Sequence, residues 1–166
     1  MKKTMSLRKN SFLESMPLSI LDSQSDQLTV KCKFNFSYID FSQGAGQSFD
    51  QWSKKQLIEL LDKLKCYSGE ALKHWMKTPI GSGKKRGQVL AVYGKFPSKS
   101  DFIHPKYIPA DVRWARFRLE SDSRLVGFII PEDKNGTLHS KTKQRFDSNT
   151  FYVVFLDEQH KFYKSK

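Results

Sequence analysis

Apolar and polar residues alternate without a break from residue 28 to residue 38. Because successive side chains of an extended chain point to opposite faces, this period of two predicts a strand with one buried face. Three more extended runs lie near the C-terminus, at residues 114–119, 124–130 and 151–163. The first alternates apolar with charged residues, whereas the second is apolar on both faces, as a central strand is. We therefore expect a small antiparallel sheet in the last third of the chain.

The spacing of apolar residues changes to a helical period between residues 49 and 76. Ser48 and Gln51 have the spacing of a capping box, so a first helix is predicted to begin near Phe49. Ser68 can cap a second, shorter helix that ends near Met76. The predicted fold class is α+β: an N-terminal strand and a helical hairpin, followed by a three-stranded antiparallel meander that packs on the helices.

These elements are predicted to form a single α+β domain at residues 27–166. Residues 1–26 mix charge, serine and weak hydrophobicity, which indicates a flexible N-terminal arm or a marginal helix. Two stretches interrupt the domain as inserted loops. The stretch 78–111 is rich in glycine, basic residues and proline, and the stretch 131–149 has turn residues followed by basic ones.

No apolar run in the 166 residues approaches the roughly 20 residues needed to cross a bilayer. The apolar residues near the N-terminus are interrupted by polar ones, so the continuous core of a secretory signal is missing. Cys32 and Cys66 are too isolated to suggest a disulfide framework or a metal cluster. Together these features predict a cytoplasmic protein.

The formal net charge is +12 at pH 7. A basic surface favours phosphate backbones, so a nucleic acid is the expected partner, although an acidic protein, or no charge-driven partner, stays open. Part of this charge falls in the two inserted loops, where the following residues are expected to contact RNA: Lys84, Lys85, Arg86, Lys143 and Arg145. The stretch 78–87 lacks the spacing of a phosphate-binding P-loop.

Two short motifs near the C-terminus carry a family resemblance. The tetrapeptide Ser-Arg-Leu-Val begins at Ser123, and the tetrapeptide His-Lys-Phe-Tyr begins at His160. With the order of elements around them, these motifs resemble the RelE/ParE superfamily of toxins from bacterial toxin–antitoxin pairs, and within it the HigB-type branch. The chain departs from that family in the long connection between its last two strands and in the extra residues 78–111.

The resemblance implies a RelE-like fold and a metal-independent endoribonuclease that cleaves mRNA, often in the ribosomal decoding site. It further implies that a cognate antitoxin protein holds this activity inactive. We expect no cofactor, and no membrane partner because no apolar run is long enough to cross a bilayer. The residues themselves predict no metal site either, because His74, His104 and His139 lie in three unlike segments without a cysteine or carboxylate at ligand spacing.

RNA cleavage by its own 2′-hydroxyl needs a group that takes up the proton, cations that stabilise charge on the phosphate, and a proton donor for the departing 5′-oxygen. His160 is the candidate general acid or base, because imidazole transfers protons near neutral pH. Arg124, with Arg116 or Arg118 from the neighbouring strand, is expected to clamp the phosphate with its forked donors.

Three further residues are candidates for the same site. Tyr163 can stack on a base or orient the phosphate, Lys161 adds positive charge, and Glu120 is a second candidate base. The hypothesis requires His160 and Arg124 to lie side by side on an open concave surface.

The same residues are compatible with other functions. A non-catalytic basic nucleic-acid-binding protein of a phage or mobile element could hold RNA or DNA on this sheet, and a protein of a third class could block another protein by charge. A toxin of this superfamily that poisons gyrase would not need His160. Arg116, Arg118 and Glu120 could also form an ordinary solvated sheet face, where alternating charges contribute little to stability.

Overall fold

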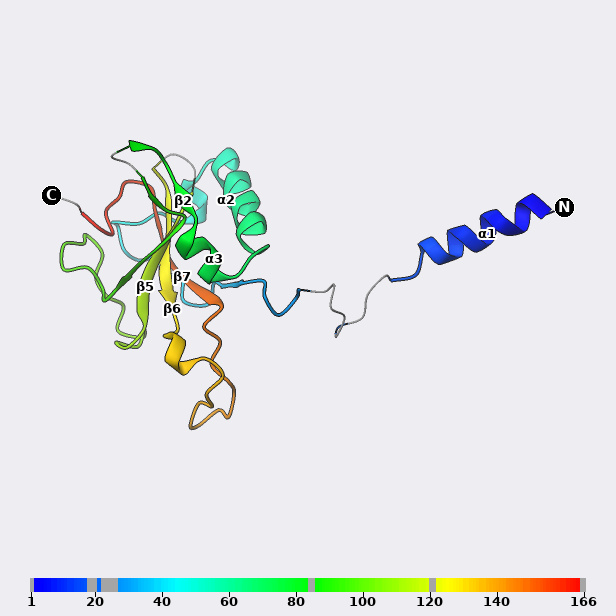
Figure 1. Ribbon diagram of the computed structural model, residues 1–166. Coiled ribbons are helices and arrows are strands. Elements are labelled where there is room, and N and C mark those ends of the chain that lie inside the picture. Colours follow the sequence, from blue (N-terminus) through cyan, green and yellow to red (C-terminus); the bar gives the residue numbers. More distant parts are fainter. Residues whose placement is uncertain (1, 18–20, 22–26, 84–85, 120–121, 165–166) are drawn as a thin grey trace.

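The computed structural model describes residues 2–17, 21, 27–83, 86–119 and 122–164 (Figure 1). Its centre is a mixed five-stranded sheet with the strand order β1-β7-β6-β5-β4. These strands are β1 (Lys33–Asn35), β4 (Leu90–Gly94), β5 (Arg113–Arg118), β6 (Arg124–Ile129) and β7 (Thr150–Asp157). β1 runs parallel to β7, and the other neighbouring strands are antiparallel. A small second sheet pairs β2 (Pro79–Ile80) with β3 (Gly87–Gln88).

The described residues form the helices α1 (Lys2–Glu14), α2 (Lys54–Tyr67) and α3 (Leu72–Lys77). Figure 1 shows α2 and α3 beside the sheet, whereas α1 lies away from it. Helix α1 occupies part of the predicted N-terminal arm, and residues 18–20 and 22–26 of that arm lie outside the described residues. None of the described helices has the length and apolar character required to cross a bilayer.

The α+β class predicted from the sequence is confirmed, but the predicted strand at residues 28–38 is wrong for most of its length. Only β1 is extended and paired within this stretch. Before it, the chain turns, because the backbone N–H groups of Val30 and Lys31 both donate to the carbonyl of Gln27. After it, the side chain of Asn35 accepts hydrogen bonds from the N–H and the hydroxyl of Ser37, which ends the strand.

The helix starts also differ from the prediction. The capping box of Ser48 and Gln51 forms, but it caps only a 3₁₀ turn, and Ser53 begins α2 with a capping box of its own. Ser68 ends α2 instead of starting the next helix. Helix α3 begins at Leu72, whose N–H donates to the side chain of Asn149 from the loop before β7. A residue distant in the sequence therefore supplies the acceptor that an N-cap side chain usually provides.

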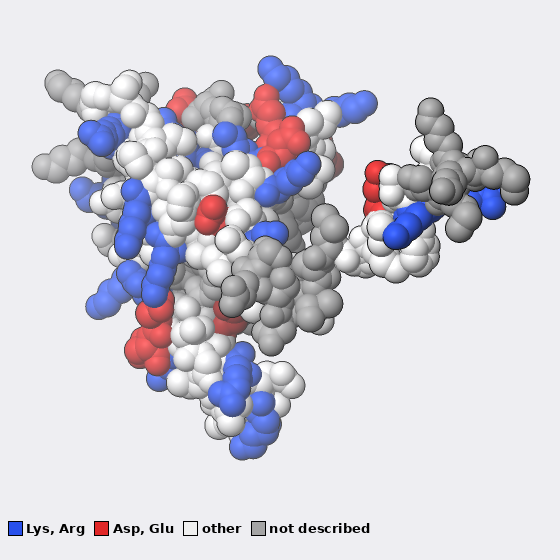
Figure 2. Space-filling view, turned by 45° about the vertical axis from the view of Figure 1, so that its right-hand side comes forward, with Lys and Arg blue, Asp and Glu red and all other residues white. Residues whose placement is uncertain are grey.

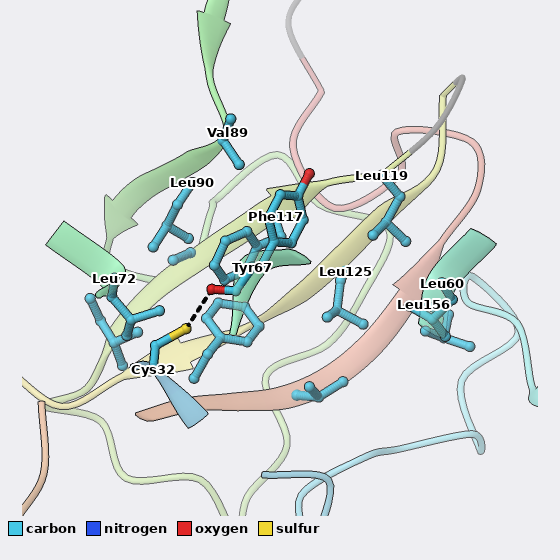
Figure 3. Close-up of a cluster of buried hydrophobic side chains, with 14 of the residues drawn as sticks. Cys32, Leu60, Tyr67, Leu72, Val89, Leu90, Phe117, Leu119, Leu125 and Leu156 are labelled. Carbon is cyan, nitrogen blue, oxygen red and sulfur yellow. Dashed lines mark hydrogen bonds between the residues drawn. The ribbon is translucent and has the colours of Figure 1, made fainter. Parts of the chain in front are cut away.

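Each face of the sheet has its own core. On one face, residues of α2 and α3 pack on β5 and β6, and Figure 3 shows Tyr67 of α2 against Phe117 of β5. Their rings stack with centroids 4.8 Å apart. The inserted stretch 78–111 covers part of the other face, where Phe102 and Ile108 pack with Trp114 of β5. Because side chains alternate along a strand, β5 turns Phe117 towards the helices, and it turns Arg116 and Arg118 to the opposite face.

Candidate active site

A cavity of about 970 Å³ opens where β5 ends, β6 begins and β7 ends. Its basic lining side chains are Lys99, Arg116, Arg118, Arg124, Lys161 and Lys164. Among the described residues, its acidic lining side chains are Asp122 and Asp157. An excess of positive charge in a concave site favours an anionic ligand and concentrates it locally.

Three arginines from two neighbouring strands form the floor of this positive site. Arg116 and Arg118 lie on either side of Phe117 in β5, and Arg118 is directly opposite Arg124 of β6. Arg124 is 3% exposed, and its burial, followed by the charges of Arg116 and Arg118, lowers the pKa of its guanidinium to about 10. The group is therefore still charged at neutral pH. An anion in the cavity would offset the repulsion among these cations.

His160 contacts this cluster. Its Nε2 lies 3.2 Å from Nη2 of Arg124, while Nη1 of Arg124 donates to the carbonyl of Ser123 at 2.7 Å. Because a guanidinium only donates, the contact suits a neutral imidazole whose Nε2 accepts. The backbone of His160 lies in the left-handed region, with φ of 55°.

The same Nε2 atom also lies 3.3 Å from Oδ1 of Asp122. A carboxylate only accepts, so this contact suits an imidazole that carries a proton on Nε2. His160 therefore has a partner in each protonation state: Arg124 when Nε2 is bare and Asp122 when it is protonated. An imidazole held in this way can take up a proton and release it again beside a bound anion.

Aromatic side chains form one wall of the cavity. Tyr163 is 52% exposed, and its ring stacks on that of Tyr93, with centroids 4.8 Å apart and 7° between the planes. The hydroxyl of Tyr93 accepts a hydrogen bond of 2.6 Å from Nε of Arg116, and burial raises the pKa of this hydroxyl. The wall thus orients one of the arginines and leaves an aromatic surface open to solvent.

The structure brings together most of the residues predicted for the catalytic site. His160, Arg124, Tyr163, Arg116, Arg118 and Lys161 all line the cavity. Glu120 lies outside the described residues, as do Lys84 and Lys85, and Arg86 is not among the lining residues.

Lys143 and Arg145 lie far from the cavity along the sheet. Their loop connects the end of β6 to the start of β7, which is the opposite end of these strands from the cavity. Figure 2 shows Lys and Arg side chains gathered at the lower tip of the molecule, where Figure 1 places this loop. Arg145 donates to the carbonyl of Gly136 within the same loop. Any contact of these two residues with RNA stays a prediction and would be made away from the cavity.

Sequence reasoning missed several lining residues, namely Tyr93, Lys99, Asp122, Asp157 and Lys164. Only Asp122 had a local signal, because it lies between two strands that carry arginines. Tyr93 and Lys99 belong to the inserted stretch, whose position over the sheet no local pattern reveals.

The described residues contain no group of three or more His, Cys, Asp or Glu side chains placed to hold a metal ion. The resemblance to RelE/ParE toxins stays a prediction. No protein-family model, no curated protein and no solved structure matches this chain.

Proposed function

We propose that this protein is a metal-independent endoribonuclease that cleaves mRNA, a RelE/HigB-like toxin controlled by an antitoxin. The observation that carries the nuclease part is the 3.2 Å contact between Arg124 and His160 inside a positively charged cavity. In this contact an imidazole, which can transfer protons, lies beside a guanidinium, which can bind phosphate. The mRNA target, action on the ribosome and the antitoxin rest on the sequence resemblance.

The reaction is a transesterification within the RNA chain. The 2′-oxygen forms a bond to the adjacent phosphorus, and the bond from phosphorus to the 5′-oxygen breaks, which yields a 2′,3′-cyclic phosphate and a free 5′-hydroxyl. Neutral His160 takes the proton of the 2′-hydroxyl. Tyr163 and Lys161 line the same cavity and are the candidate donors of a proton to the departing 5′-oxygen.

The arginines supply the electrostatic part. Negative charge develops on the phosphate oxygens as the new bond forms, and guanidinium groups that are already in place stabilise it without reorganisation. Burial of Arg124 strengthens this effect, because less water screens its charge. Arg116 is oriented by Tyr93 and completes the clamp.

The direct test incubates purified protein with a labelled single-stranded RNA in the presence of EDTA and analyses the product ends. We expect 2′,3′-cyclic phosphate ends, and a rate that falls about 10²- to 10⁴-fold in His160→Ala. Arg124→Gln should also lose most of its cleavage. Matched controls are His74→Ala and Arg113→Gln, since both side chains are exposed and lie outside the cavity. Cleavage that persists unchanged in both site variants would reject the assignment.

The second candidate is a protein that holds nucleic acid without cutting it. The basic lining of the cavity favours it, because these side chains would bind phosphates whether or not His160 acts. It predicts RNA binding that weakens steeply with salt, an intact RNA after incubation, and no effect of His160→Ala on growth of a bacterial host. The nuclease proposal predicts growth arrest that His160→Ala relieves.

A further inference from the structure

The loop that carries His160 is wrapped around one buried carboxylate. Strand β7 ends at Asp157, which is 1% exposed. Its Oδ1 accepts hydrogen bonds from the backbone N–H groups of Gln159 at 3.2 Å and Lys161 at 3.0 Å. Its Oδ2 accepts from the N–H of Phe162 at 3.0 Å. A buried carboxylate is stable when its oxygens receive such bonds, so the three N–H groups replace the water that Asp157 has lost.

These bonds determine the backbone on both sides of His160. Gln159 and Lys161 flank it and bind the same oxygen atom, which forces the chain to turn back at the residue between them. His160 accordingly has a φ of 55°, a conformation that residues other than glycine rarely adopt. The carboxylate bonds therefore offset the free energy that this conformation costs.

The position of Asp157 in the sheet explains where the imidazole arrives. Asp157 is directly opposite Arg124 in the register of β6 and β7. A loop that begins at this point and turns back immediately places its central side chain beside the guanidinium. This is the observed contact between His160 and Arg124.

The far end of the loop is held separately by the inserted stretch. The N–H of Asp101 donates to the carbonyl of Lys161, and the N–H of Lys164 donates to the carbonyl of Lys99. Phe162 is buried against Phe102. These contacts fix the loop from Lys161 onwards. The direction of the His160 side chain is then set by the hydrogen bonds of Asp157 to Gln159 and Lys161.

We propose that Asp157 is the positioning residue of the site, which holds the imidazole of His160 against Arg124 without itself touching the RNA. Its effect on cleavage rests on the proposed nuclease function, but its effect on the loop does not. Asp157→Asn keeps one acceptor oxygen, and Asp157→Ala removes both. The expected order of damage is therefore Ala greater than Asn, with Asp133→Asn, in an exposed turn at the other end of the sheet, as the matched control.

The first measurement needs no RNA. Amide hydrogen exchange and the imidazole NMR signals are recorded for the wild type and the variants. In Asp157→Asn, the amides of Lys161 and Phe162 should exchange faster, and the Cε1–H signal of His160 should shift, while the amides of β5 and β6 stay protected. Unchanged signals of His160 in folded Asp157→Asn would overturn the proposal.

The second measurement is RNA cleavage. Misplacing a catalytic group by about 1 Å can cost about 10²-fold, so kcat should fall roughly 10-fold in Asp157→Asn and about 100-fold in Asp157→Ala, with little change in KM. Adding Asp157→Asn to His160→Ala should cause no further loss, because a residue that acts through His160 has no effect once His160 is gone. If the double variant loses a further 10-fold in kcat, or if Asp157→Asn changes only KM, Asp157 does not act by positioning His160 and the proposal is overturned. If the wild type cuts no RNA, the nuclease proposal fails, and the NMR measurement still decides the role of Asp157.

Discussion

Replacing Arg124 with methionine is expected to make the fold more stable while it removes the proposed phosphate contact. The pKa of Arg124 falls well below its ordinary value, to about 10, first because the group is buried and then because Arg116 and Arg118 lie close to it. Since each pKa unit corresponds to about 1.4 kcal/mol, the folded protein holds this charge at a cost of about 3 kcal/mol relative to the unfolded chain. A depressed pKa of a base disfavours the folded state below that pKa. The cost is therefore present in full at pH 7 and would vanish only as the pH rises above about 10 towards the ordinary pKa of arginine.

Methionine is neutral and fills much of the same space, so it removes this cost. The substitution also removes the hydrogen bonds to the carbonyl of Ser123 and to His160, which are worth about 1 kcal/mol each. The carbonyl of Ser123 keeps the N–H of Leu119 as a donor, so it is not left unsatisfied. The expected net gain is about 1 kcal/mol, or about 2–4 °C in Tm for a chain of this size.

Differential scanning calorimetry at pH 7 and low salt measures this gain. If Arg124 binds phosphate as proposed, added inorganic phosphate should raise the Tm of the wild type and leave that of Arg124→Met nearly unchanged. Arg113→Met is the control: this arginine is exposed at the other end of β5, so its loss should change stability by less than about 0.5 kcal/mol. A clearly lower Tm for Arg124→Met than for the wild type would refute the reasoning, because it would mean that the buried charge stabilises the fold.

The remaining predictions concern the scaffold. In Gly127→Ala, the added Cβ would lie 2.0 Å from the carbonyl oxygen of Tyr152 in β7, so the sheet must open at the irregularity between β6 and β7. We expect a loss of about 3 kcal/mol or more in chemical denaturation, and a variant as stable as the wild type would contradict this contact. Burial raises the pKa of the Cys32 thiol to about 11, whereas Cys66 is exposed. A thiol reagent should therefore label one cysteine quickly in the native protein and both after unfolding, and rapid labelling of native Cys66→Ser would contradict the burial of Cys32.

Strands β5 and β6 could be predicted from the sequence because their signals are local, whereas the run predicted at residues 151–163 is extended only up to Asp157, the end of β7. Residues of β5 alternate in polarity, which places Arg116 and Arg118 on one face whatever the rest of the chain does. The connection from β5 to β6 is short, so the two strands pair as antiparallel neighbours. In the observed register Arg124 lies opposite Arg118, which completes the arginine cluster.

In the N-terminal half of the domain, local patterns were misleading because the hydrogen-bond partners of the strand and of α3 come from distant segments. The alternation at residues 28–38 predicted a long strand, but only β1 finds a partner, in β7 near the other end of the chain. Ser68 has the chemistry of an N-cap, yet α3 begins where Asn149 offers an acceptor. Both outcomes depend on hydrogen bonds between segments that are far apart in sequence, and propensity contains no information about them.

The sequence by itself thus determined the α+β class, the positive charge and the side of the sheet on which the arginines lie, since these follow from composition and from the period of the strands. Only the tertiary structure decided that His160 meets Arg124, that Tyr93 joins the site, and that the inserted stretch holds the last loop in place. The physical reason is that each of these contacts joins segments far apart in the sequence, whose proximity is created by sheet pairing and core burial.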